Sequence, residues 1–255
     1  MAAMSGRGTS TLATRGVRLT RIALHLLRGA LIVAAVFPFL DAQGRRNAVE
    51  RWSHALLRIL VVHLHVYGEP PIRPAQPVML VANHVSWLDI FAINAVVSVR
   101  FVAKSEIRRW PVIGWLSART GTLFIERAQR RDTTRINQLV AEAMLAGDVA
   151  AVFPEGTTTD GSRVLRFHSS LLQPASLAAA GVQPVALRFE RGDGSLCVEA
   201  AYDGDKSLWD SFGAIVAQPE IHAHVWFLPV LPAGATHRRE LADTAQAAIA
   251  DRLTS

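Results

Sequence analysis

A histidine and an aspartate lie five residues apart in the segment VANHVSWLDI, which closes the apolar run PVMLVA. On one continuous helix, five residues turn through about 500°, so the side chains of His84 and Asp89 would point about 140° apart and could not touch. If a strand ends near Asn83 and a helix begins after Ser86, the loop between them can bring the imidazole to the carboxylate. The spacing therefore allows a histidine–carboxylate pair at the end of a strand.

Such a pair could transfer a proton. A carboxylate on one imidazole nitrogen fixes the tautomer and stabilises the imidazolium, which leaves the other nitrogen free to accept a proton from a substrate hydroxyl. That hydroxyl supplies the nucleophile, so no serine of the protein is required. The competing interpretation is structural: Ser86 and Asp89 match the serine-x-x-acid pattern of a helix cap, and His84 then only fills space.

Two further segments carry polar residues at the end of an apolar run. GTLFIER ends in Glu126 and Arg127, and AVFPEGTTTDG continues into Glu155 and Gly156. Ligands of open α/β sheets usually bind where strands end. There, Arg127 could hold an anion in bidentate fashion, Glu155 could accept a hydrogen bond from a hydroxyl, and Gly156 allows close approach of the backbone. Each segment alone is also compatible with an ordinary turn and an exposed charge.

The elements that must position these residues alternate between strand-like and helix-like patterns. This alternation predicts an α/β fold with a largely buried mixed sheet flanked by helices. Short apolar runs predict strands at Val61–Tyr67, Val78–Ala82, Arg100–Ala103, Thr122–Ile125, Val149–Phe153, Val182–Arg188, Leu196–Ala201 and Val225–Val230. Helical periodicity predicts helices at Leu88–Val96, Pro111–Ala118, Asp132–Ala146, Leu171–Ala180 and Glu240–Leu253.

The N-terminal region is basic and apolar. Arg18, Arg21, His25 and Arg28 would form one stripe on a helix, and the uncharged run GALIVAAVFPFL follows. This run of twelve residues is shorter than the roughly 20 residues that span a bilayer. We therefore expect partial insertion, with His25 and Arg28 at the headgroup boundary. A signal peptide and a buried core helix are the alternatives.

A second amphipathic segment, NAVERWSHALLRIL, follows a predicted turn. The two segments together predict an N-terminal membrane-binding helical hairpin over residues 1–61, followed by an α/β domain over residues 62–255.

Composition narrows the function classes. The chain has 255 residues, a formal net charge of +6 and one cysteine, Cys197, which excludes an internal disulfide and favours a reducing compartment. The charge suits nucleic acid or an anionic membrane. The early arginines lie on an apolar helix without an aromatic stacking motif, which disfavours nucleic acid. The pairs His63/His65 and His222/His224 lack a third ligand nearby, so no metal site is predicted.

Four ordered segments together resemble the glycerolipid O-acyltransferase family, typified by 1-acylglycerol-3-phosphate acyltransferase. NHVSWLD matches the family's asparagine-histidine, four residues, aspartate motif, and GTLFIER matches its second block. FPEGT and VQPVAL match the third and fourth motifs, so the resemblance covers residues 82–187.

The resemblance implies a reaction. His84 would be the general base, oriented by Asp89, and the acceptor alkoxide would attack an acyl thioester carried by coenzyme A or acyl carrier protein. Neither a covalent acyl-enzyme nor a further cofactor is implied. The implied partners are membrane lipids, and the implied location is the inner, cytoplasmic membrane with the catalytic domain on the cytoplasmic side. The alternative is a catalytically silent, membrane-tethered lipid-binding protein of the same fold.

The resemblance also implies an acceptor site. Its residues would be Lys104, Arg127, Glu155, Gly156, Thr157 and Thr158, with Lys104 and Arg127 facing an anionic head. Thr158 stands where phosphate-acceptor members commonly carry an arginine, and a hydroxyl cannot replace the charge of a guanidinium. At this position the chain looks like the subgroup that acylates lyso-ornithine lipid. The acceptor therefore stays open between a 1-acylglycerol-3-phosphate type and lyso-ornithine lipid.

Overall fold

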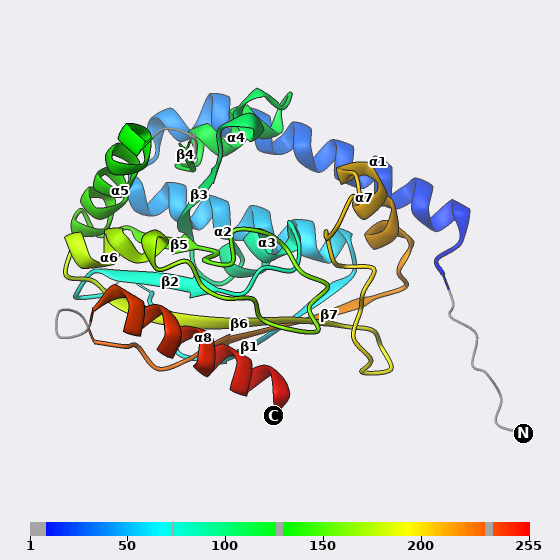
Figure 1. The fold of residues 1–255 in the computed structure, drawn as a ribbon. Helices are drawn as coiled ribbons and strands as arrows, with labels where there is room; N and C mark the ends of the chain where they lie inside the picture. Colours follow the sequence, from blue (N-terminus) through cyan, green and yellow to red (C-terminus); the bar gives the residue numbers. More distant parts are fainter. Residues whose placement is uncertain (1–8, 73, 126–129, 233–236) are drawn as a thin grey trace, which may run out of the picture.

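The centre of the protein is a seven-stranded mixed sheet. A computed structural model describes residues 9–72, 74–125, 130–232 and 237–255. The strand order is β1-β7-β6-β2-β5-β3-β4, and every neighbouring pair is parallel except β6 with β7 (Figure 1). The strands are β1 Val62–Gly68, β2 Val78–Ala82, β3 Val99–Lys104, β4 Leu123–Ile125, β5 Val149–Val152, β6 Gly181–Glu190 and β7 Ile221–Phe227. The predicted mixed α/β fold is confirmed.

Helices cover both faces of the sheet, which explains why β2 is apolar at every position. Met79 and Val81 pack toward α5 (Arg130–Leu145), α6 (Gln173–Leu177) and α8 (Arg238–Thr254). Leu80 and Ala82 face the opposite layer, since side chains alternate along a strand. That layer contains α2 (Ala42–Ile59), α3 (Leu88–Asn94) and α7 (Leu208–Ala217), and α1 (Leu12–Leu31) lies outside them (Figure 1).

The N-terminal hairpin is confirmed as two helices. Past Leu31, α1 continues through a π-helical segment and a 3-10 turn to Phe39, and Asp41 then caps α2 by accepting the Gly44 amide at 2.7 Å. The hairpin shares a hydrophobic cluster with the sheet. The predicted division into two domains at residue 61 therefore stays a prediction. By length and composition, Leu12–Phe39 is long and apolar enough to cross a membrane. Of its most apolar stretch of 18 residues, 28% is buried inside the protein.

Half of the polar stripe of α1 faces inward, which corrects one expectation. Arg18 and His25 are buried, whereas Arg21 and Arg28 are exposed. The Arg18 guanidinium donates to the backbone carbonyls of Val216 (2.9 Å), Gln218 and Pro219 (2.8 Å), just beyond α7. The expected placement of His25 at the headgroup boundary is therefore wrong.

His25 instead joins α1 to α2. Its Nε2 lies 3.0 Å from the Trp52 carbonyl oxygen, the Trp52 indole N–H donates to the His25 carbonyl at 3.2 Å, and the two rings stack at 4.5 Å. Gly29 makes room for this contact, because a Cβ there would lie 2.5 Å from the Trp52 ring nitrogen.

Two predicted strands differ from the structure, and one helix of the structure was not predicted. The strand predicted at Leu196–Ala201 is wrong: apart from an isolated antiparallel bridge between Leu196 and Glu190, the segment forms turns, with the Ala200 amide donating to the Cys197 carbonyl. The last strand spans Ile221–Phe227 rather than Val225–Val230. Helix α7 was not predicted, although its first turn carries a capping box formed by Ser207 and Asp210.

Candidate active site

His84 lies at the carboxyl edge of the parallel part of the sheet. It follows Ala82 by two residues, where β2 ends between β5 and β6. The parallel strands β5, β3 and β4 end at the same edge, because β2, β5, β3 and β4 all run in one direction. The segments that follow these strands are those in which the sequence predicted site residues.

The predicted approach of His84 to Asp89 is confirmed. His84 Nδ1 lies 2.7 Å from Asp89 Oδ2, and the carboxylate has no exposed surface. The same oxygen accepts the backbone amides of Val85 (2.8 Å) and Ser86 (2.9 Å). Asp89 therefore anchors the loop and binds the imidazole at once, while its role in orienting a catalytic base stays a prediction.

The cap itself is only half formed. Asp89 Oδ2 accepts the Ser86 amide, but the Ser86 hydroxyl accepts the amide of Leu88 at 3.3 Å rather than that of Asp89. Helix α3 begins at Leu88, one residue later than the serine-x-x-acid pattern predicted, with Trp87 at the N-cap.

The imidazole of His84 stacks on Phe153, an interaction that the sequence did not indicate. The ring centroids are 3.9 Å apart with planes inclined by 10°, and Phe153 in turn stacks on Phe101 at 5.7 Å. The side chain of His84 is 21% exposed, and within the described ranges its Nε2 has no hydrogen-bond partner. One nitrogen is thus held by a carboxylate and the other is open to a proton donor.

The backbone of His84 is held on both sides by the segment PEGTTT, residues 154–159. Its amide donates to Glu155 Oε1 at 2.8 Å, and its carbonyl accepts the Thr159 amide at 2.9 Å. Glu155 Oε2 accepts the amide of Leu165 at 2.9 Å, so both oxygens of this buried carboxylate bind backbone. Burial raises the pKa of Glu155, while the hydrogen bonds from Leu165 and His84 act in the opposite direction. This arrangement favours a positioning role over direct contact with an acceptor hydroxyl.

The other predicted acceptor-binding residues differ in backbone conformation, exposure and hydrogen bonding. Gly156 adopts φ +74°, a left-handed conformation that suits glycine, and Thr157 is exposed. The Thr158 hydroxyl donates to the Tyr202 carbonyl. Lys104 ends β3 at the carboxyl edge, but its side chain, like the whole of Arg127, lies outside the described residues. Their contact with an acceptor therefore stays a prediction.

The alternating histidines lie away from this site. β1 pairs with β7 so that His63 is opposite His222 and His65 is opposite His224. His65 Nε2 and His222 Nδ1 are 3.0 Å apart, and the rings stack along the strands. Within the part of the chain that the structure describes, no group of three or more His, Cys, Asp or Glu side chains is arranged to hold a metal ion.

Comparisons with known proteins identify the family to which the chain belongs. The family model described as Acyltransferase matches residues 63–188. Lyso-ornithine lipid O-acyltransferase of Pseudomonas aeruginosa is 38% identical over 213 residues, which cover 83% of this chain and 81% of that protein. The chain belongs to the acyltransferase family.

Another relative of this chain and one solved structure are named for a glycerophosphate acceptor instead of lyso-ornithine lipid. The 1-acyl-sn-glycerol-3-phosphate acyltransferase of Neisseria meningitidis is 36% identical over 214 residues, 82% of this chain and 83% of that protein. The crystal structure of the 1-acyl-sn-glycerophosphate acyltransferase from Thermotoga maritima aligns with a TM-score of 0.69 at 21% identity, covering 94% and 96% of the two chains. That likeness shows a shared fold.

Asn83, the first residue of the acyltransferase's NHVSWLD segment, joins strands rather than lining the site. Its side-chain amide donates to the Leu187 carbonyl at 2.9 Å, and its side-chain oxygen accepts the Leu187 amide at 2.7 Å. The buried pair holds the end of β2 against β6, directly before His84. Asn83 thus fixes the strand end from which His84 projects.

Glu155→Gln tests the positioning role. A glutamine has one acceptor oxygen for the two amides, so one buried N–H loses its partner, which costs about 1–3 kcal/mol. We expect a matching fall in the free energy of unfolding, measured by urea titration, and slower acyl transfer because His84 loses a backbone anchor. Glu142→Gln, an exposed position on α5, is the matched control. Wild-type rate and stability in Glu155→Gln would contradict this role.

Proposed function

We propose that the protein transfers a fatty acyl group from a thioester, carried by acyl carrier protein or coenzyme A, to the hydroxyl of a lysolipid. The observation that carries the proposal is the 2.7 Å contact of His84 Nδ1 with Asp89 beside an open Nε2. Nε2 takes the proton of the acceptor hydroxyl as its oxygen attacks the thioester carbonyl. The ester C–O bond forms, the C–S bond breaks, and the leaving thiolate receives the proton from His84.

Direct transfer is supported by the state of the cysteine and the nearby serine. Cys197 is buried, and burial raises the pKa of its thiol to about 11, so almost no thiolate exists at neutral pH. Ser86 is buried with its hydroxyl bound to the Leu88 amide. Neither side chain is suited to carry an acyl intermediate, whereas the acceptor hydroxyl can reach Nε2 from solvent.

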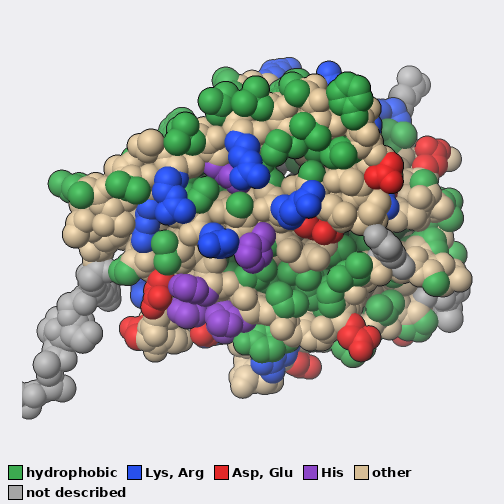
Figure 2. All heavy atoms as spheres, turned by 180° about the vertical axis from the view of Figure 1, so that it is seen from behind, with side chains coloured by type: hydrophobic (Ala, Val, Ile, Leu, Met, Phe, Trp, Pro, Cys, Tyr) green, Lys and Arg blue, Asp and Glu red, His purple; other side chains and the backbone are tan. Residues whose placement is uncertain are grey.

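The outer face of α1 supports attachment to a membrane. The buried positions recur along the whole helix at Arg18, Ile22, His25, Gly29, Val33 and Phe37. The opposite face exposes Val17, Leu19, Leu24, Leu27, Leu31, Val36 and Phe39. Figure 2 shows hydrophobic side chains gathered along the upper edge of the molecule, where α1 and α4 (Ile113–Arg119) lie in Figure 1. A helix that packs lengthwise on its own protein inserts one face into the interface rather than crossing the bilayer.

The triple variant Leu24→Asp/Leu27→Asp/Leu31→Asp tests this attachment. Each leucine that leaves the apolar phase loses about 1.5–3 kcal/mol, so we expect vesicle partitioning to fall by about a thousandfold or more. Flotation with phosphatidylcholine vesicles measures it. Leu145→Asp/Leu177→Asp places the same change on exposed leucines of α5 and α6 and should leave partitioning near wild type. Equal losses in both variants would refute insertion by α1.

The acceptor is proposed to be lyso-ornithine lipid, in bacterial membrane lipid synthesis at the cytoplasmic face of the inner membrane. The relatives' names include both acceptor types at similar identity, so the names do not decide. Thr158 is the distinguishing position: its hydroxyl is bound to the Tyr202 carbonyl and supplies no positive charge. Phosphate monoesters carry nearly two charges at neutral pH and normally require several cations.

Thr158→Arg tests the acceptor. Purified protein is offered lysophosphatidate and lyso-ornithine lipid side by side with an acyl carrier protein thioester. We expect the wild type to acylate lyso-ornithine lipid and the variant to shift about ten- to a hundredfold in relative rate toward lysophosphatidate, since one charge-assisted contact is worth about 1.5–3 kcal/mol. Ser170→Arg places the same charge on an exposed residue outside the predicted acceptor site and should leave the relative rates as in the wild type.

One result would reverse the assignment of the acceptor: a wild type that is efficient on lysophosphatidate, inactive on lyso-ornithine lipid and indifferent to Thr158→Arg. Other arginines, such as the exposed Arg163 and Arg166 that follow the segment PEGTTT, would then supply the charge. Failure to acylate either lipid would refute the proposed function itself.

A further inference from the structure

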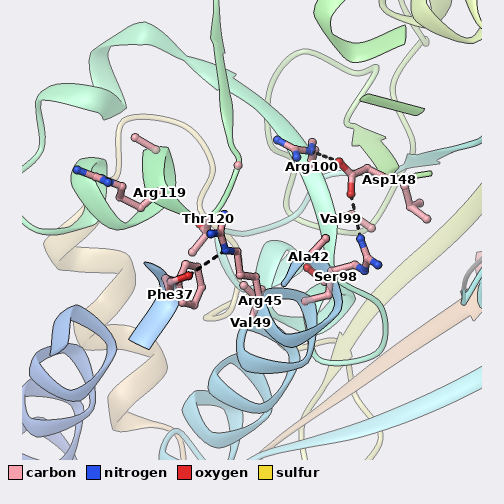
Figure 3. A pocket seen from close by; sticks show the side chains of 14 residues that line it. Phe37, Ala42, Arg45, Val49, Ser98, Val99, Arg100, Arg119, Thr120 and Asp148 are labelled. Carbon is pink, nitrogen blue, oxygen red and sulfur yellow. Dashed lines mark hydrogen bonds and ion pairs between the residues drawn. The ribbon is translucent and has the colours of Figure 1, made fainter. Parts of the chain in front are cut away.

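A cavity of about 260 Å³ lies at the amino edge of the sheet, opposite the His84 edge. Its wall is formed by the end of the α1 segment at Phe37, the first two turns of α2, the starts of β3 and β5, and the end of α4 (Figure 3). Arg100 is the second residue of β3 and Asp148 precedes β5, whereas His84 follows the opposite end of β2. A strand of five residues separates the edges by about 16 Å, so the cavity is not part of the candidate active site.

The lining is strongly basic. It contains Arg45, Arg46, Arg100 and Arg119 but one carboxylate, Asp148. Asp148 is shared, with Arg46 Nη1 at 3.3 Å from one oxygen and Arg100 Nε at 2.6 Å from the other. Figure 3 shows the Arg119 guanidinium directed away from the other labelled arginines, so three guanidinium groups and one carboxylate leave an excess of two positive charges at the cavity.

Arg45 reaches into this space without an acidic partner. Figure 3 shows its side chain rising from α2 toward Phe37 and Thr120, and its Nε donates to the Phe37 carbonyl at 3.1 Å. In the described parts of the chain, no carboxylate pairs with Arg45 or Arg119. The carbonyl fixes the direction of the Arg45 guanidinium and leaves its terminal nitrogens for another acceptor.

We propose that this cavity binds a phosphate group, and that its source is the headgroup of an anionic membrane lipid. The planar fork of a guanidinium matches phosphate oxygens in bidentate fashion, and the Arg45 guanidinium has no carboxylate partner among the described residues. Gly121 preserves the space, because a Cβ there would lie 3.0 Å from the Arg100 guanidinium.

The surroundings of the cavity favour a lipid as the source. Phe37 lines it, and the adjacent Val36 and Phe39 are exposed on the face of α1 that is proposed to insert. On the other side, Val112, Ile113 and Trp115 are exposed at the start of α4, and the Arg119 guanidinium lies 5.9 Å from the Trp115 ring. Tryptophan and arginine are suited to headgroup depth. Apolar segments thus flank a basic cavity on two sides.

The test compares Arg45→Gln with Arg51→Gln in the full chain. Both arginines are exposed on α2, but Arg51 does not line the cavity. In one arm, flotation compares phosphatidylcholine vesicles with and without phosphatidylglycerol. We expect phosphatidylglycerol to strengthen binding of the wild type and of Arg51→Gln, and this gain to fall about tenfold or more in Arg45→Gln. Arg45→Lys should restore part of the gain, since it keeps the charge without the fork.

The second arm separates the two possible phosphate sources. Inorganic phosphate is titrated at constant ionic strength against the detergent-solubilised protein, and its effect on the unfolding temperature is measured. A phosphatidylglycerol gain that depends on Arg45, with little response to inorganic phosphate, supports the lipid headgroup. Stabilisation by inorganic phosphate that is lost in Arg45→Gln, with an unchanged phosphatidylglycerol gain, supports the phosphate site but overturns its lipid source.

The proposal is overturned if Arg45→Gln and Arg51→Gln behave alike in both arms. The lipid arm rests on the membrane attachment proposed above, whereas the phosphate arm does not. Neither arm measures acyl transfer, and His84→Ala should bind like the wild type in both. Failure of the cavity proposal is therefore distinguishable from failure of the proposed reaction.

Discussion

Replacing His84 by alanine is expected to lower the rate of acyl transfer by a factor on the order of 10² to 10⁴, the usual contribution of a positioned general base. The variant removes the nitrogen that would take the hydroxyl proton, together with the stack on Phe153 and the bond to Asp89. The fold should persist, because Val85 and Ser86 still donate to Asp89 and Glu155 still binds the backbone amide of residue 84.

The measurement is the initial rate with a saturating thioester, alongside thermal unfolding. His54→Ala, an exposed histidine on α2, is the matched control and should turn over like the wild type. A folded His84→Ala protein with near-normal turnover would exclude His84 as the base.

Asp89→Asn should reduce acyl transfer by a comparable factor, on the order of 10² to 10⁴, while the loop keeps its shape. All three donors, from His84, Val85 and Ser86, converge on the single oxygen Oδ2, and an amide oxygen can take that place. An amide cannot stabilise the imidazolium that forms when His84 accepts a proton. The loss should appear in kcat more than in KM, because it concerns charge that develops during the reaction.

The steady-state parameters and the urea midpoint of Asp89→Asn are compared with those of Asp243→Asn, an exposed carboxylate on α8. If Asn at position 89 preserves both stability and kcat, Asp89 is only an anchor for the loop.

The arrangement around His84 was predictable in outline because the signal is local. An apolar run followed by His84, Ser86 and Asp89 within one loop allows few conformations, and the one that joins the two side chains also begins a helix. The roles of Phe153 and Glu155 were not predictable, since their contacts with His84 bridge about 70 residues of sequence. A glutamate after a strand end suggests substrate binding as readily as it suggests an anchor for a neighbouring amide.

Helix α1 shows a second limit of prediction from the sequence alone. The spacing of Arg18, Arg21, His25 and Arg28 predicts a polar face, and a polar face ordinarily turns toward water or headgroups. The acceptors of Arg18 are carbonyls near the end of α7, about 200 residues away, which no local pattern indicates. The structure therefore reverses the expected orientation for half of this stripe while keeping the predicted hairpin.

The misassigned strands have local explanations. Leu196–Ala201 is apolar enough for a strand, but beyond the isolated bridge of Leu196 to Glu190 its amides bond within turns. In β7, His222 and His224 interrupt the apolar run, so the sequence predicts a strand that begins at Val225, whereas the buried positions alternate from Ile221 onward. Helix α7 could have been found, since Ser207 and Asp210 form a serine-x-x-acid pattern before an apolar segment.

The double anchoring of the His84 backbone has a thermodynamic consequence for turnover. Its amide and carbonyl are both bound, its ring is stacked, and one ring nitrogen is occupied, so the side chain has little rotational freedom left before substrate arrives. The ordering of this group is complete once the chain has folded and is not repeated in each catalytic cycle. Loosening the anchor at Glu155 or Thr159 should therefore make the activation entropy of acyl transfer more negative, even where the distance between His84 and Asp89 is unchanged.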